Sequence, residues 1–414
     1  MIIVFVLLLA LAIPVAWAML GGAAAALMIA GKPMGAIAIS LYSPTQSFPM
    51  LAIPFFILAG NLMMSGRFGV YLVNIARLLV GHMKGGMGQV SIIGSVMFGG
   101  VSGSAVADAS AMGTALIPVQ TKEGYPAGFA AAINASSSTV AVLIPPSIPL
   151  ILYGLVSNVS IIDLFVAGIL PGLMLGFGMF ITVWLVARRK NLPRSPLPGG
   201  FREFRGELLA AIPALLMPVF VIGTLRFGIA TPTEVSVMAV AYALVVSGLI
   251  YRDLSFGSVW SAAVDTVMMT GAVMIIIMAS SVIQWILTAE RIPQGLAAWV
   301  TGSITQPWLV ILALNIVMLI VGCFLDLPAA ILLLGPLFVT IGKAIGLDLV
   351  QLGLMMVVNL SIGLYTPPVG TTLFISAAIA RCGIGEVVRA LLPFYLVALL
   401  VLALISYLPA LTIY

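Results

Sequence analysis

Charged residues are scarce in this chain of 414 residues, since Asp, Glu, Lys and Arg together make up 7% of it. A soluble domain carries about 25% charged residues, whereas 62% of the residues here are hydrophobic. The composition therefore excludes a soluble enzyme or binding domain and predicts an all-α polytopic membrane protein. A crossing helix needs roughly 20 apolar residues, so the length allows about ten to twelve crossings. The apolar segments are too long for the strands of an outer-membrane barrel.

Residues for catalysis and metal binding are also few. The chain has one histidine, His82, and two cysteines, Cys323 and Cys382, which lie in apolar surroundings and which we expect to be buried thiols. It contains no HExxH motif, no GxxxxGK[ST] loop and no Cys/His cluster. Residues 100–103 match the GxSG of rhomboid-type intramembrane proteases, but His82 lies in a basic connection and supplies no base for that serine. We therefore expect no enzyme and no cofactor, and a protease is the weakest alternative.

The net charge of +5 comes from Lys and Arg residues that gather between apolar segments. The longest polar stretch, residues 188–206, is a linker rich in Arg, Lys, Pro and Gly. Basic residues are retained in cytoplasmic loops, so we expect this linker to be cytoplasmic and expect no nucleic-acid binding. A cleaved signal peptide has Lys or Arg before its apolar region. The first apolar segment here, residues 2–30, has neither residue ahead of it. It is therefore predicted to be the first membrane helix.

The linker divides the chain into two halves with similar hydrophobic patterns, residues 1–187 and residues 207–414. Each half has a segment that is too long for one crossing and has a polar or glycine-rich middle, which predicts a re-entrant helical hairpin. Each half also has a span interrupted by two prolines. Proline removes a backbone donor and clashes with the preceding turn, so these spans are expected to be broken helices. The hairpins are predicted at 87–121 and 307–342, and the broken helices at 125–157 and 346–380.

One spacing of 222 residues relates the breaks of the two halves, which is typical of an internal repeat. It takes Pro145 to Pro367, Pro146 to Pro368, Gly100 to Gly322 and Ser104 to Asp326. If the first hairpin opens to the cytoplasm beside His82 and Lys84, counting the crossings makes the second hairpin open outward. We therefore predict two inverted repeats, as in many secondary transporters, whose binding sites form where the broken helices meet.

Broken helices inside a membrane are tolerated only where their backbone is buried in protein or lines a wet cavity. Freed carbonyls suit a hard cation such as sodium, and freed helix N-termini suit an anion. The candidate sodium-binding residues are Gly100, Ser102, Gly103, Ser104, Ser137, Pro145, Gly322, Asp326, Gly363, Thr366 and Thr371. The candidate substrate-binding residues are Asn134, Ser138, Pro146, Ser147, Asn359, Pro368 and Thr372.

Several of these residues have structural alternatives. Serine and glycine also let helices approach closely, and this interpretation stays open for any single serine. Asp326 is either an ion ligand or a helix cap. Glu234, in the sequence Thr-Pro-Thr-Glu, is predicted to belong to a capping box. A channel would need a continuous polar pore, whereas the polar residues here gather at mid-span breaks, which favours a carrier.

The same residues resemble those of a known family, the large membrane subunit (DctM type) of tripartite ATP-independent periplasmic (TRAP) transporters. The matching stretches are spread over almost the whole chain, in the order that the family has. They are 81–86 (GHMKGG), 101–107 (VSGSAVA), 124–126 (GYP), 144–147 (IPPS), 231–234 (TPTE), 322–326 (GCFLD) and 366–370 (TPPVG).

This resemblance implies an elevator-type carrier of the bacterial inner membrane, in which a transport domain slides against a scaffold. It also implies coupling to a sodium gradient and two partner proteins: a small four-helix membrane subunit (DctQ type) and a periplasmic substrate-binding protein (DctP type). The expected substrate is a small organic acid, such as a C4-dicarboxylate or sialic acid. A single-component sodium/anion symporter is the nearest alternative, followed by an ion channel.

Overall fold

The structure is a computed structural model that describes residues 1–194, 200–304 and 306–412, without the side chains of 200–204. Within these ranges the chain is helical and contains no strand, so the all-α prediction is confirmed. The α-helices before the linker are α1 (Ile2–Ala10), α2 (Val15–Ile29), α3 (Gly35–Tyr42), α4 (Ala52–Met64), α5 (Phe68–Val80), α6 (Gly86–Ser102), α7 (Ala105–Lys122), α8 (Ala127–Ser137), α9 (Ile148–Ser157) and α10 (Ile161–Arg189).

The second half continues with helices of similar lengths. They are α11 (Gly200–Arg226), α12 (Pro232–Leu244), α13 (Phe256–Ala289), α14 (Ile292–Ser303), α15 (Pro307–Gly322), α16 (Leu327–Ala344), α17 (Leu349–Gly363), α18 (Thr371–Ala380) and α19 (Ile384–Tyr407). Short turns are η1 (Ser43–Gln46), η2 (Phe48–Leu51), η3 (Ser138–Val142), η5 (Pro409–Thr412) and the π-helical η4 (Val245–Ile250).

The N-terminal segment differs from the prediction. Residues 2–30 are not one membrane helix but a hairpin of α1 and α2, in which Gly22 lies against Met1 and Phe5. The chain reverses at Ala12, whose φ is +58°, and at Pro14, which precedes α2. Proline cannot donate the hydrogen bond that would continue a helix. The nine residues of α1 reach only about 13 Å, too short to cross a membrane.

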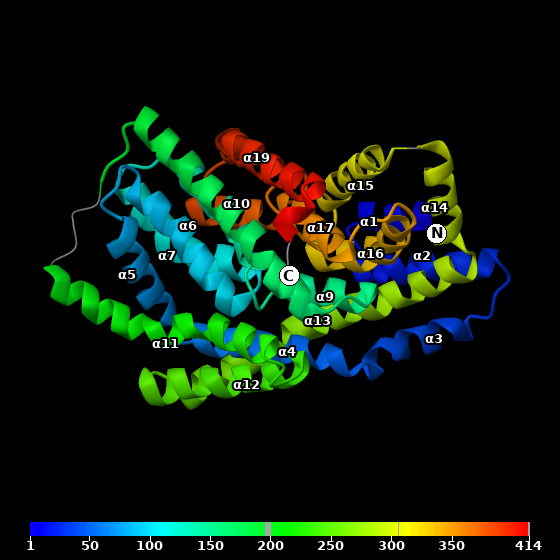
Figure 1. Cartoon of the computed structure of the whole chain (residues 1–414), viewed down its shortest axis with the longest axis horizontal. Helices are drawn as coiled ribbons and strands as arrows, with labels where there is room; N and C mark the ends of the chain where they lie inside the picture. The colour runs from blue at the N-terminus through cyan, green and yellow to red at the C-terminus, as the bar shows by residue number, and fades with distance from the viewer. Residues whose placement is uncertain (195–199, 305, 413–414) are drawn as a thin grey trace.

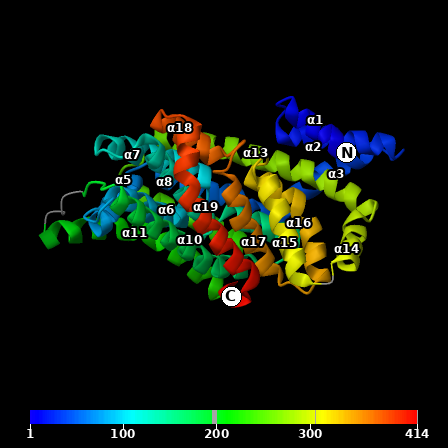
Figure 2. The ribbon, with the colours of Figure 1, turned by 90° about the horizontal axis from the view of Figure 1, so that it is seen from above.

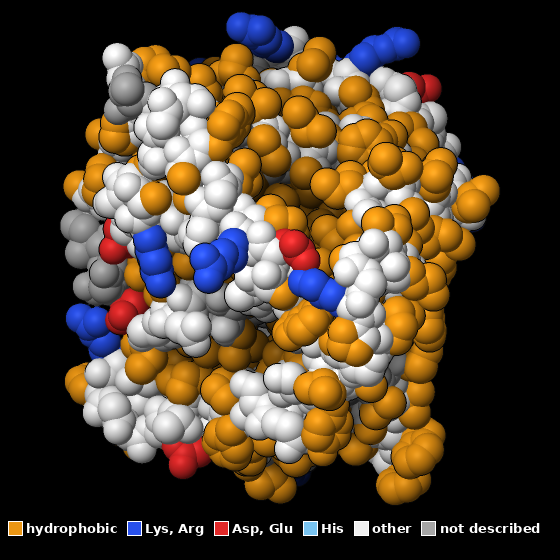
Figure 3. All heavy atoms as spheres, turned by 90° about the vertical axis from the view of Figure 1, so that its right-hand side faces the viewer, with side chains coloured by type: hydrophobic (Ala, Val, Ile, Leu, Met, Phe, Trp, Pro, Cys, Tyr) orange, Lys and Arg blue, Asp and Glu red, His pale blue; other side chains and the backbone are white. Residues whose placement is uncertain are grey.

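The described residues also contain fewer long helices than the ten to twelve crossings that the length allows. Six helices are long and apolar enough to cross, or seven if α3 with η1 and η2 with α4, bent by 66°, form one span. The number of long helices is lower for a physical reason. The two broken spans are interrupted at their prolines, and the first hairpin is interrupted at its glycine-rich tip. Large hydrophobic side chains cover much of the outer surface, with charged side chains at few places (Figure 3). This surface is typical of a protein in contact with lipid.

The helices form two packed sets. The outer set comprises α2–α4 and α11–α13, in which α4 packs on α12 and α13, and α13 also packs on α2 and α3 (Figure 1). The broken-helix set comprises α6–α10 and α15–α19. In Figure 2 the helices α10, α19, α17, α15 and α16 follow one another side by side, in agreement with their contacts. The two sets meet mainly where α4 and α11 contact α6 and where α13 contacts α16, and α5 and α14 each contact both sets.

The helices of the broken-helix set recur with the spacing noted in the sequence. Adding 222 to the bounds of α7, 105 and 122, gives 327 and 344, which are the bounds of α16. The same sum takes the start of α8, 127, to 349, where α17 begins. It also relates α5 to α14 within two residues, and neither of these two amphipathic helices was predicted. The inverted orientation of the halves stays a prediction.

The two halves exchange helices across the centre of the molecule. Helix α18 packs on α7 and α8 of the first half, and α9 packs on α16 and α17 of the second half. This reciprocal packing brings both proline breaks and both hairpin tips to the middle of the broken-helix set. The predicted linker is shorter than 188–206 in the structure, because α10 extends to Arg189 and α11 begins at Gly200. Its central residues 195–199 lie outside the described residues.

Candidate functional site

The tip of the first hairpin is pressed against the first proline break. Helix α6 ends at Gly103, whose φ is +57°. A methyl group on Gly103 would lie 2.0 Å from the carbonyl oxygen of Pro146. Ser104 then caps α7, since its Oγ accepts a hydrogen bond from the Ala107 N–H at 3.4 Å. Both the positive φ and the close approach require glycine at position 103.

The first broken helix restarts with a cap of its own. Helix α8 gives way to η3 at Ser138, and α9 begins again at Ile148 after the two prolines. The Ser147 Oγ accepts a hydrogen bond from the Leu150 N–H at 3.3 Å and donates one to the carbonyl of Val142. The hydroxyl therefore stabilises the N-terminus of α9 and the end of η3 at once.

The second hairpin is held to the second break in a similar way. A methyl group on Gly363 would lie 2.2 Å from the carbonyl oxygen of Gly322, the last residue of α15. The Val369 N–H donates a hydrogen bond to the Cys323 carbonyl at 3.2 Å. Each hairpin tip thus touches the broken helix of its own half through backbone atoms.

Ser104 and Asp326 occupy the same place in their hairpins but bond differently. Asp326 is the N-cap residue of α16, and its side chain makes no capping hydrogen bond to the later turn. Its carboxylate interacts instead with the N–H of Leu327, and Pro328, the second residue of α16, has no N–H. Ser104 therefore has the hydrogen bond of a helix cap, whereas Asp326 interacts only with the first N–H of its helix.

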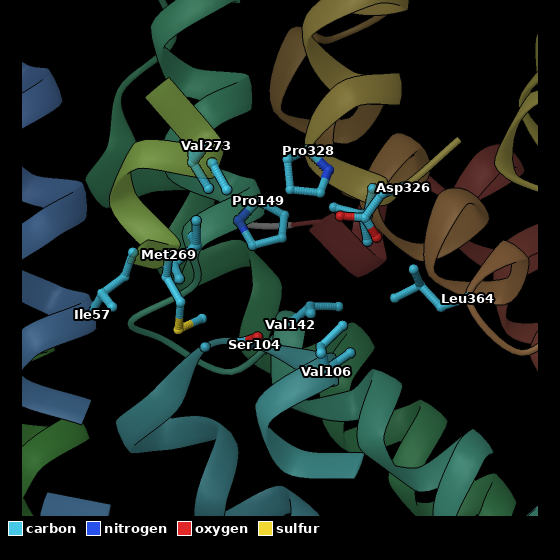
Figure 4. Close-up of a pocket in the computed structure, with 15 residues that line it drawn as sticks. Ile57, Ser104, Val106, Val142, Pro149, Met269, Val273, Asp326, Pro328 and Leu364 are labelled. Carbon is cyan, nitrogen blue, oxygen red and sulfur yellow. The ribbon is translucent and has the colours of Figure 1, made fainter. Parts of the chain in front are cut away.

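Both tips and both breaks line one cavity of about 210 Å³. In Figure 4 the side chains of Ser104 and Asp326 lie on different walls of this cavity, with Met269 and Val273 of α13 closing it. The lining residues are Ile57, Gly103, Ser104, Ala105, Val106, Val142, Ile148, Pro149, Met269, Ala272, Val273, Asp326, Leu327, Pro328 and Leu364. We call it the central cavity.

The central cavity combines features that suit an anion and a cation. Helices α7, α9 and α16 all begin at its wall, with Ala105, Ile148 and Leu327 as their first residues. Their N-termini contribute partial positive charge and N–H donors. Helix α17 ends there at Leu364, whose carbonyl oxygen accepts hydrogen bonds from the Thr372 and Leu373 N–H groups and from the Thr372 hydroxyl. Asp326 is the one charged side chain among the described lining residues.

Of the predicted sodium-binding residues, Gly103, Ser104 and Asp326 lie on the central cavity. The others lie just behind its wall or in helix contacts. Ser102 bonds to the N–H of Ser104, Gly100 faces Pro218 of α11, and Gly322 meets Gly363. The Ser137 hydroxyl is hydrogen-bonded to that of Ser95 at 3.1 Å, and the Thr366 hydroxyl donates to the Ile362 carbonyl at 2.6 Å. Pro145 is buried in the first break. The Thr371 hydroxyl has no hydrogen-bond partner among the described residues.

Six of the seven predicted substrate-binding residues are buried, and Pro368 is exposed. Asn134 donates to the Ala109 carbonyl at 2.8 Å and to Ser376 at 2.9 Å, which joins α8 to α7 and α18. Asn359 donates to the side chain of Asn315 at 2.8 Å. Thr372 and Ser138 donate to backbone carbonyls. Ser147 and Pro146 lie in the first break and Pro368 in the second. None of these seven side chains is among the described residues that line the central cavity.

Two further carboxylates, Glu234 and Asp108, lie outside the lining of the central cavity. Thr231 and Glu234 form the predicted capping box at the start of α12, so the structural role of Glu234 is confirmed. Asp108 lies in the first turn of α7, fully buried, with Ser95 as its polar neighbour. The outer wall of the cavity was not predicted. It consists of Ile57, Met269 and Val273, apolar residues that a sequence gives no reason to single out.

A cavity built from two hairpin tips and two broken helices, inside an all-α protein with a lipid-facing surface, defines a secondary transporter. The sequence model of the family "Tripartite ATP-independent periplasmic transporter, DctM component" matches residues 2–411. The chain belongs to this family, which confirms the resemblance found in its sequence.

Two relatives illustrate the match. The chain is 36% identical over 394 residues to the C4-dicarboxylate TRAP transporter large permease protein DctM of Pseudomonas aeruginosa, covering 95% of this chain and 92% of that protein. It is also 36% identical over 405 residues to the 2,3-diketo-L-gulonate TRAP transporter large permease protein YiaN of Escherichia coli, covering 98% and 95%. The crystal structure of the Alcanivorax borkumensis YdaH transporter has the same fold, with a TM-score of 0.67 at 15% identity, covering 90% of this chain and 87% of that one.

The chain is therefore the large permease subunit of a TRAP transporter for organic acids and a multi-pass protein of the inner membrane. It is a transport subunit and not an enzyme, so the protease alternative is wrong. The family's transporters are tripartite, which implies a periplasmic binding protein and a small membrane subunit as partners.

Proposed function

We propose that this subunit carries one small organic acid together with sodium ions through the central cavity. The observation that carries the proposal is that Ser104 and Asp326, at the tips of the two hairpins, line the same cavity. Three helix N-termini at its wall favour the carboxylate of a substrate. The two relatives described above are named for a C4-dicarboxylate and for 2,3-diketo-L-gulonate, and we propose a substrate of the same carboxylate class.

Sodium is the proposed coupling ion for an electrostatic reason. A carboxylate substrate would meet the carboxylate of Asp326 in a cavity whose described lining offers no Lys or Arg. Two like charges in a poorly solvated site repel each other strongly. A sodium ion at each hairpin tip would offset this repulsion, with ligands from carbonyl oxygens such as those of Pro146 and Gly322 and from Ser104 and Asp326. No resident cofactor is needed for this mechanism.

The proposed movement is an elevator, in which the broken-helix set slides against the outer set. Small and apolar residues meet at the contacts of α6 with the outer set. Gly100 of α6 faces Pro218 of α11, and Gly60 of α4 faces the backbone of Val101. Such surfaces lack directional hydrogen bonds that would fix one position. A DctQ-type small subunit would hold the outer set still, and a DctP-type binding protein would deliver the acid.

The test is uptake of a labelled C4-dicarboxylate or sialic acid into proteoliposomes that contain this subunit, its small subunit and its binding protein. We expect uptake driven by an inward sodium gradient and no uptake when potassium replaces sodium. Equal uptake under both gradients would contradict sodium coupling. Full activity of this subunit alone would contradict the need for both partners and favour a single-component symporter.

A further inference from the structure

A second hollow, distinct from the central cavity, lies at the far end of α9. It has a volume of about 270 Å³ and lies between η1, α9, α13 and α16. Half of its described lining residues carry polar side chains, and none of the described ones is charged. The polar ones are Ser43, Ser47, Asn158, Ser280, Ser281 and Gln284. We call this hollow the polar vestibule. Its chemistry differs from that of the central cavity, whose lining is mostly apolar.

The central cavity and the polar vestibule are lined by the same faces of the same helices. On α13, Met269 and Val273 line the cavity, and Ile277, Ser281 and Gln284 line the vestibule. Spacings of three or four residues place these side chains on one stripe of the helix. From the first to the last the stripe rises about 22 Å. Helices α9 and α16 also contribute to both hollows, so the two lie along one interface between the helix sets.

The polar vestibule also continues to the surface. A wider hollow of about 570 Å³ shares Ser47, Leu155 and Asn158 with it. This wider hollow reaches the starts of α10 and α12, at Ser160 and Thr231. Polar groups therefore line the route from the surface to the apolar stretch of α13 that leads to the central cavity.

The vestibule opens on the face opposite the basic linker. Asn158 and Ser160 precede α10, whereas Arg188 and Arg189 lie at its other end, 29 residues later. A helix of this length measures about 43 Å, enough to separate the two faces of a membrane. Basic residues mark the cytoplasmic side, which puts the vestibule on the periplasmic side.

Two side-chain amides in the vestibule are ready to bind a ligand. Neither Asn158 nor Gln284 has a side-chain hydrogen bond to any described residue, and both are exposed. Their N–H groups suit the carboxylate and hydroxyl oxygens of an organic acid. Because the described lining of the vestibule contains no Lys or Arg, it would hold an anion weakly, as a transit site requires.

We propose that the polar vestibule is a transit site that receives the organic acid from the periplasm through the amides of Gln284 and Asn158. The proposal rests on the proposed function of organic-acid uptake and adds its entry route. The residues act before the acid reaches the hairpin tips, so they determine the KM for the acid and leave the sodium dependence unchanged.

The test compares KM for a C4-dicarboxylate in the complete three-component system. Gln284→Met keeps the length of the side chain and removes the amide. Asn158→Gly also removes an amide and tolerates the φ of +55° at that position. We expect each to raise KM about tenfold, since a lost hydrogen bond to a charged group has roughly that effect. Gln294→Met, at an exposed glutamine of α14 outside the hollow, serves as the matched control and should leave KM unchanged.

Labelling supplies a readout that does not depend on turnover. In a background with Cys323→Ala and Cys382→Ala, Gln284→Cys should react with a membrane-impermeant thiol reagent from the periplasm, and the C4-dicarboxylate should slow this reaction. Unchanged KM in both vestibule variants, or labelling that the acid does not slow, would overturn the transit site. Uptake without sodium dependence would instead contradict only the ion coupling, because KM for the acid is measured separately.

Discussion

Ser104 and Asp326 are separated by 222 residues, hold the N-cap positions of two 18-residue helices, and face the same cavity. Ser104 has a neutral hydroxyl that caps α7. Asp326 has a carboxylate, and the second residue of its helix α16, Pro328, has no N–H that could donate to it. Two equivalent tips thus offer different chemistry to one cavity. Among the described residues that line the cavity, the acidic side chain is on the tip of the second hairpin.

The first prediction separates capping from ion binding at Ser104. Loss of an N-cap side chain costs about 1 kcal/mol of stability, so Ser104→Ala should lower thermal stability and also reduce sodium-driven uptake. Ser255→Ala removes a cap from α13, where Ser255 accepts from the Ser258 N–H at 3.1 Å, and serves as the control. It should lower stability alone. Equal loss of uptake in both variants would reduce Ser104 to a structural cap.

The second prediction concerns the close approach of tip and break. Gly103→Ala would place a methyl group 2.0 Å from the Pro146 carbonyl, and we expect loss of uptake with reduced thermal stability. Gly346→Ala is the matched control, because Gly346 also has a positive φ, +72°, but no atom lies within 4 Å of the added methyl. It should cost only the strain of the left-handed conformation, about 1–2 kcal/mol. The comparison of the two melting temperatures therefore isolates the contact with Pro146, and equal shifts would contradict it.

The third prediction tests the orientation of the protein. With the native cysteines replaced by alanine, His82→Cys should resist a membrane-impermeant maleimide in intact cells, and Ser160→Cys should react. Both positions are exposed, so accessibility within the protein does not distinguish them. The opposite labelling pattern would reverse the topology and the side on which the polar vestibule opens.

Several features could be predicted from the sequence because one local signal determines each of them. Paired prolines and glycine-rich tips fix where helices α8, α17 and the hairpins break, and the capping box at Glu234 is a short-range pattern. The N-terminal hairpin was missed because uniform apolarity hides a reversal at Ala12. Helices α5 and α14 were missed because amphipathic helices shorter than a membrane crossing give a weak hydropathy signal.

The site itself was only partly predictable. Its tips follow from the repeat, but its outer wall consists of α4 and α13 residues whose position depends on packing between distant segments. Asn134 and Asn359 were predicted to bind the substrate, but the structure places their side chains in helix contacts. Both lie near breaks in the sequence, yet their side chains turn toward neighbouring helices and bond to Ala109 and Asn315. A polar residue near a break can face either direction, and the sequence alone does not specify which.

The most direct test of the account is the sodium concentration that gives half-maximal uptake of the organic acid by the reconstituted three-component system. Asp326→Asn removes the negative charge of the central cavity with little change of shape, so this concentration should rise severalfold, because a nearby carboxylate favours a bound cation. Glu234→Gln removes a carboxylate that caps α12, and glutamine also suits a capping box, so it should leave the value unchanged. An Asp326→Asn complex whose half-maximal sodium concentration equals that of the native complex would contradict the claim that the tip of the second hairpin binds the coupling ion.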